Sequence, residues 1–179
     1  MANDTITLSY FGGGASMYFL KKMSCVVAVI QLASVANAQG RLPAKPGEIV
    51  EGMQSCLSAT TEKAVEADKL KSDGWHAASV TANGKAVDTS LVFFGKGNLL
   101  LITDKTAKAP ACTITAHIQG AEAFDGVTSA IMNTLNVDGR AKSADRDTIY
   151  FFPKGHIVQL VKTGTSESPA IRIAVGFMP

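Results

Sequence analysis

The feature that most limits what this chain can fold into is its N-terminus, which has the three parts of a secretory signal peptide. Lys21 and Lys22 supply the positive charge, residues 25–35 form an apolar core, and residues 36–38 (Ala-Asn-Ala) are a small-x-small cleavage site. The apolar core is shorter than the roughly 20 residues that a membrane-spanning helix needs. We therefore expect the protein to be exported, to the periplasm or the medium, after cleavage that removes residues 1–38.

The first sixteen residues do not belong to an ordinary signal peptide. They are polar and glycine-rich, and they precede the positive charges. Translation from Met17 would give a leader of usual length. We therefore place the signal peptide at residues 1–38, with the true start possible at Met17.

The charge of the mature chain excludes several classes of partner. Of 17 basic and 15 acidic residues, the leader removes Lys21, Lys22 and Asp4, which leaves 15 and 14 in a mature chain of 141 residues. A nucleic-acid-binding protein would carry a basic stripe, whereas these lysines and arginines are scattered singly. We therefore expect no nucleic-acid partner. After cleavage of the leader we also expect no membrane span. The length of the mature chain suits a single domain.

The cysteines predict a disulfide bond. Cys25 leaves with the signal peptide, so Cys56 and Cys112 remain as an even pair in an oxidising compartment. Cys56 falls on the apolar face of a helix predicted from Pro46 onward, and Cys112 faces inward on a strand with clean alternation over residues 111–118. The bond would therefore join a helix to a sheet.

The remaining pattern predicts one α+β domain over residues 46–179, after a short disordered mature N-terminus at residues 39–45. A helix, or a helix pair, spans the region up to residue 71, and a second helix spans residues 121–135. The predicted strands lie at residues 76–81, 90–94, 98–103, 111–118, 148–152, 156–162 and 170–177.

Short turns between these strands indicate a mainly antiparallel sheet. We expect two helices packed on one face of a curled sheet of about six to seven strands. The nearly continuous apolar runs at 90–94 and 98–103 predict central strands with both faces partly covered.

No catalytic or metal-binding motif is present. Residues 162–165 (Lys-Thr-Gly-Thr) resemble the strand motif of the penicillin-recognising serine enzymes, but the Ser-x-x-Lys nucleophile of that family is missing. His76, His117 and His156 fall on three separate elements without zinc-ligand spacing. We therefore predict no catalytic residues, no metal and no cofactor, and lean against an enzyme.

Two functions remain open. The first is a non-catalytic interaction or accessory protein whose partner is an unknown protein or envelope component. The second is a domain that binds a small apolar ligand in a cavity between helices and sheet, with Trp75, His117 and Tyr150 as candidate ligand-binding residues.

The leader and the disulfide predict one measurable mass. Protein exported by a host and purified without reductant should begin at Gln39, because cleavage follows Ala38, and should weigh two hydrogens less than the reduced chain. Native mass spectrometry tests both features together. A mass that retains residues 25–38, or two free thiols, would contradict the expectation.

Overall fold

The structure of the chain is a computed structural model that describes residues 30–31, 42–79, 81–82, 85–86, 88–136, 142–143 and 147–178. The charged region and the cleavage site of the predicted signal peptide lie outside these residues, as do residues 39–41 of the predicted mature tail. Within the predicted leader, β1 (Ile30–Gln31) pairs with β3 (Thr81–Ala82), which pairs in turn with β4 (Lys85–Ala86). β3 and β4 are antiparallel, with Thr81 opposite Ala86.

Helix α1 (Pro46–Ala59) begins where the sequence predicts it. Proline at the first position suits a helix start, and the carboxylate of Glu48 accepts the backbone N–H of Lys45 at 2.8 Å. The helix ends at Ala59, because the next residue, Thr60, has an extended backbone and bridges to Val65. A short helix α2 (Ala67–Ser72) follows, so the helix pair is the correct alternative.

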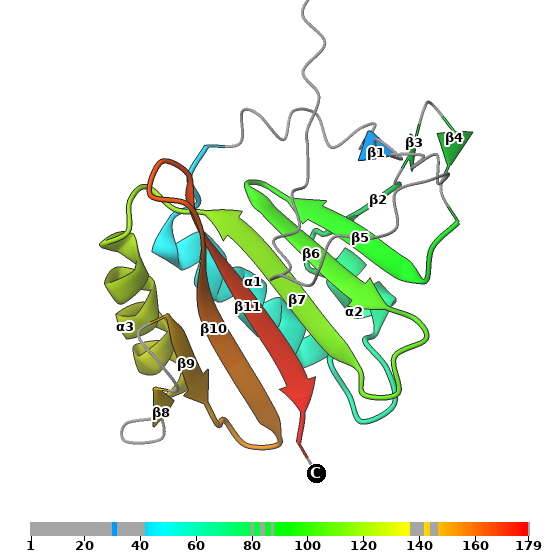
Figure 1. Ribbon diagram of the computed structural model, residues 1–179. Helices are drawn as coiled ribbons and strands as arrows, with labels where there is room; N and C mark the ends of the chain where they lie inside the picture. Colours follow the sequence, from blue (N-terminus) through cyan, green and yellow to red (C-terminus); the bar gives the residue numbers. More distant parts are fainter. Residues whose placement is uncertain are drawn as a thin grey trace, which may run out of the picture.

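Seven strands of three or more residues form the main antiparallel sheet of the described chain, and the two-residue β8 extends it at one edge (Figure 1). The strands are β2 (His76–Ala78), β5 (Leu91–Lys96), β6 (Leu99–Asp104), β7 (Ala111–His117), β8 (Lys142–Ser143), β9 (Thr148–Phe151), β10 (His156–Gly164) and β11 (Pro169–Phe177). Their order in space is β2-β5-β6-β7-β11-β10-β9-β8.

The expectation of a curled sheet is wrong. The sheet is open, with β2 at one edge and β8 at the other, and these edge strands do not pair with each other. The reason lies in the connectivity: two antiparallel meanders, β2-β5-β6-β7 and β8-β9-β10-β11, meet through their last strands, β7 and β11. Each meander therefore extends outward from the centre, and neither brings its first strand back toward the other.

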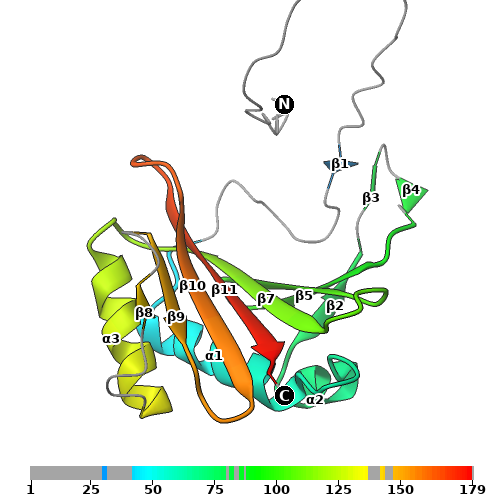
Figure 2. The same ribbon diagram turned by 60° about the horizontal axis from the view of Figure 1, so that its bottom comes forward.

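The helices cover one face of this sheet. Figure 2 shows α1, α2 and α3 (Ala123–Leu135) on the same side, with α1 beneath the central strands. Inward side chains alternate along each strand: Phe94, Leu101, Ile114, Ile173 and Leu160 are each at most 1% exposed. Burial of this apolar surface is the main force that holds the layers together.

Gly52 lets α1 approach the sheet closely. A Cβ atom at this position would lie 2.8 Å from Cδ1 of Leu99 and 3.2 Å from Cδ1 of Ile114. A side chain there would have to displace core residues of β6 and β7. The absence of a side chain at this turn of the helix therefore sets the distance between the two layers.

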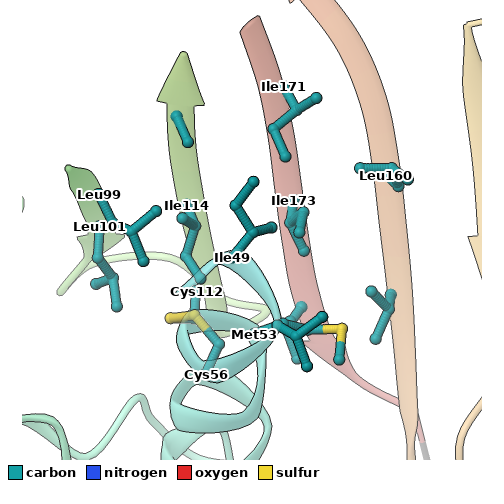
Figure 3. Close-up of a cluster of buried hydrophobic side chains, with 14 of the residues drawn as sticks. Ile49, Met53, Cys56, Leu99, Leu101, Cys112, Ile114, Leu160, Ile171 and Ile173 are labelled. Atoms are coloured by element: carbon teal, nitrogen blue, oxygen red, sulfur yellow. A yellow bond between two sulfur atoms is a disulfide. The ribbon is translucent and has the colours of Figure 1, made fainter. Parts of the chain in front are cut away.

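The predicted disulfide is present. Cys56 of α1 and Cys112 of β7 are bonded, with their Cα atoms 5.6 Å apart, and both are fully buried. Figure 3 shows the bond beside Met53 and below Ile49, on the helix side of β7. The disulfide indicates an oxidising, extracytoplasmic location, because such bonds rarely persist in a reducing cytosol.

Removal of the disulfide should destabilise the fold strongly. The bond closes a sequence separation of 56 residues, for which the chain-entropy model gives about 4 kcal/mol. Cys56→Ala/Cys112→Ala should lower the free energy of unfolding by an amount of this order, measured by urea denaturation. A change below about 1 kcal/mol would show that the packing of α1 alone holds the layers together.

Candidate functional site

The first candidate surface is the face of the sheet opposite the helices. Paired residues of neighbouring strands point to the same face, and successive residues of a strand point to opposite faces. The residues that alternate with the core positions, together with their partners on the neighbouring strands, therefore define the other side. Phe93 pairs with Ile102, Leu100 with Thr115, and Val161 with Arg172. The open face consists of these outward residues; its large apolar members are Leu91, Phe93, Leu100, Ile102, Tyr150, Ile157 and Val161.

The open face is more apolar than the solvent side of an antiparallel sheet usually is. A sheet with one face in water normally alternates apolar inward residues with polar outward ones. Here β5 and β6 place Phe93, Leu100 and Ile102 outward, each half-buried, and Leu91 is 40% exposed. No described helix covers them (Figure 1). The expectation that both faces of these strands are partly covered agrees with the half-buried state of these outward side chains, although no described helix packs on them.

Side-chain size divides the open face into a centre and two flanks. The central strands β7 and β11 present small residues outward: Ala111, Thr113, Thr115, Ala174 and Gly176. The large apolar residues stand on β5 and β6 to one side and on β9 and β10 to the other. Arg172, which is exposed, contributes a positive charge near the middle.

The structure does not bring the three candidate ligand-binding residues together. His117 and Tyr150 belong to the open face, on β7 and β9, with β11 and β10 between them. Nδ1 of His117 lies 3.3 Å from Oγ of Ser168, and the Tyr150 hydroxyl accepts a hydrogen bond from Gln159. Trp75 lies on the other side of the sheet, 1% exposed, with its ring 3.6 Å from the Cβ position of Gly52.

The buried indole N–H of Trp75 has no hydrogen-bond acceptor among the described residues. Because the ring fills space between α1 and the sheet, its packing explains its position without a ligand. Any ligand-binding role of Trp75, His117 and Tyr150 stays a prediction.

A second candidate is a pocket of about 250 Å³ at one end of the helix layer, here called the end pocket. Its lining residues come from the α1–α2 connection and the start of α2, from β5 and the end of β6, and from the β6–β7 loop. They are Lys63, Ala64, Val65, Ala67, Val92, Phe94, Thr103, Asp104, Lys105, Ala107 and Pro110. No sequence motif marks this pocket, because its walls come from three separated segments.

Asp104 lines the end pocket and pairs with Leu91 of the open face, and the pKa of its carboxyl group is lowered. The backbone N–H of Thr106 donates to it at 2.9 Å, and the Thr106 hydroxyl at 2.8 Å. These hydrogen bonds, the backbone one first, together with one from the side chain of Ser90, lower the pKa of Asp104. Asp104 is therefore a carboxylate, not a proton donor, at neutral pH.

A third hollow is a polar surface groove of about 440 Å³ between α1, the end of α2 and β5. Its cation, Lys96, donates to the backbone carbonyl of Asp73 at 2.7 Å, so this lysine acts as a structural bridge. Across the described residues, no three His, Cys, Asp or Glu side chains gather as a metal site would require. The described helices also include none long and apolar enough to cross a membrane.

Compared with protein-family models, with curated proteins and with solved structures, the chain matches none. We therefore infer its function from the chain's own surfaces.

The hydrogen bonds to Asp104 predict its pH behaviour. The carboxyl should titrate below the ordinary value of about 3.9, and Thr106→Ala or Ser90→Ala should raise its pKa by removing a donor. Because the pKa of Asp104 is lower in the folded than in the unfolded chain, its ionised carboxylate stabilises the fold. This stabilisation is fully present above the ordinary pKa and is lost as the pH falls through the lowered pKa of the folded state. The side-chain carbonyl shift of Asp104, followed by NMR against pH, measures the midpoint. An ordinary midpoint, or one unchanged in both variants, would contradict the assignment.

Proposed function

We propose that this protein is a non-catalytic binding protein of the periplasm or the secreted fraction, and that it binds a protein partner through the open face of its sheet. The observation that supports this most directly is the outward position of Phe93, Leu100 and Ile102 on a face that no described helix covers. Contiguous apolar patches of this kind mark interaction surfaces.

The size of the open face suits a protein better than a small molecule. Seven strands at a spacing of ~4.8 Å span roughly 29 Å, and six residues along a strand span about 20 Å. The footprint of roughly 600 Å² is close to the ~800 Å² that each partner contributes to a standard protein–protein interface. A small ligand would cover only a fraction of this surface.

The chemistry of the face indicates what the partner presents. Aromatic and arginine side chains are enriched at interfaces, and both types occur here, as Phe93, Tyr150 and Arg172. Arg172 is exposed and joins neither of the two ion pairs found among the described residues. An apolar segment that carries an acidic residue would therefore lie along the small residues of β7 and β11 and place its carboxylate opposite Arg172.

The interior of the domain supports an interaction protein over a domain built around an enclosed apolar cavity. Met53, Phe94 and Phe151 belong to one cluster of buried side chains between the helices and the sheet, and none is more than 1% exposed. Trp75 fills the space next to Gly52 in the same layer. Ligand pockets of the size typical for drug-like molecules need several hundred cubic ångströms of unfilled space.

Site-specific photo-cross-linking in the native cells tests the proposal. A photoreactive residue at Ile102 should cross-link the partner, whereas one at Ser129, exposed on α3, should not. The partner, identified by mass spectrometry and purified, should bind the wild-type domain. Phe93→Ser/Ile102→Ser should weaken binding at least about ten-fold, because both side chains leave the apolar contact.

Two controls make the result decisive. Ser129→Ala should leave the affinity unchanged, and circular dichroism should show that Phe93→Ser/Ile102→Ser remains folded. Equal cross-linking from positions 102 and 129, or full affinity in the double variant, would contradict the proposal. A cross-linked product that contains only two copies of this chain would show that the partner is a second copy and not a different protein.

A further inference from the structure

The end pocket combines an apolar floor with a positively charged rim. Phe94, 1% exposed, and the half-buried Val65 and Val92 form its apolar part. Lys63 and Lys105 stand at its edge, contributed by two different segments of the chain. Such a pairing of apolar surface with a few charged groups is typical of pockets that orient amphiphilic ligands.

Both lysines are available to an incoming anion. The two ion pairs among the described residues join Lys69 to Glu66 and Lys71 to Asp68, so neither involves a rim lysine. The carboxylate of Asp104 accepts hydrogen bonds from Thr106 and Ser90. Neither of the two ion pairs joins Asp104 to Lys63 or Lys105, and both lysines are exposed.

The walls of the pocket are ordered. In the α1–α2 connection, the backbone N–H of Thr61 donates to the carbonyl of Ala64 at 2.9 Å, and that of Glu66 to the carbonyl of Ala59 at 2.8 Å. On the opposite wall, the turn after β6 is fixed by the N–H of Lys105, which donates to the Ser90 carbonyl at 3.0 Å. A ligand would therefore meet a largely pre-formed site.

We propose that the end pocket binds a small anionic amphiphile, with a short acyl chain on Val65, Val92 and Phe94 and a carboxylate or phosphate between Lys63 and Lys105. The volume of about 250 Å³ sets the length of the chain, because it holds roughly eight groups of ~30 Å³ each, the volume of one water molecule in the liquid. This site lies on the helix side of the sheet, so the proposal is independent of the open face.

Titration of the oxidised domain with octanoate, octyl phosphate and octanol, followed by amide NMR shifts, tests the site. Octanoate and octyl phosphate should each cause saturable shifts in residues 63–67 and 103–107, with a Kd near or below about 1 mM. Octanol should bind at least about five-fold more weakly, because its hydroxyl group is neutral and cannot pair with the charge of either lysine. Whichever of octanoate and octyl phosphate binds more tightly would show whether the natural ligand carries a carboxylate or a phosphate.

Variants inside and outside the pocket distinguish binding in the pocket from nonspecific attraction of the anion to surface lysines. Lys63→Glu and Lys105→Glu should each weaken octanoate binding about five-fold, whereas Lys154→Glu, the same charge change in the β9–β10 turn, should not. Ala107→Trp should fill the pocket and abolish the shifts, and Ala121→Trp, exposed outside it, should not. Shifts that do not saturate, octanol that binds as well as octanoate, or equal effects of Lys63→Glu and Lys154→Glu would overturn the proposal.

Discussion

The contact between α1 and the central strands is the constraint on which the rest of the structure depends. Cys56 is bonded to Cys112 at this contact, and Ile49 and Met53 pack beside the bond. The missing side chain of Gly52 lets the helix lie close against β6 and β7. Because one helix covers strands from both meanders, it ties the two halves of the chain into a single core. The open face exists because the helices of both halves pack on this one side.

Each half of the chain consists of helical structure followed by a four-stranded meander, and the halves meet at β7 and β11. The central strands therefore come from distant parts of the sequence, with α3 between them. On the covered side their large apolar residues face α1, and on the open face they carry small residues between two apolar flanks. The same alternation that builds the core thus shapes the surface to which we assign binding.

The end pocket follows from the break between α1 and α2. Thr60 turns the chain out of the helix, and its bridge to Val65 holds the connection over the edge of β5 and β6. A continuous helix from Pro46 to Ser72 would leave no such connection to form a wall. The sequence pattern allowed either one helix or two, and the pocket depends on which of them forms.

The sequence by itself determined the features that rest on local pattern or on simple counting. These are the helix start at Pro46, the positions of most strands, the α+β class and the pairing of Cys56 with Cys112, since each depends on neighbouring residues or on two cysteines alone. Only the tertiary structure decided that the sheet is open, that β7 lies beside β11, and that no described helix packs on the outward residues of β5 and β6. Strand order and coverage depend on contacts between segments far apart in the chain. An apolar run such as residues 91–94 has the same composition whether one face of its strand is buried or both.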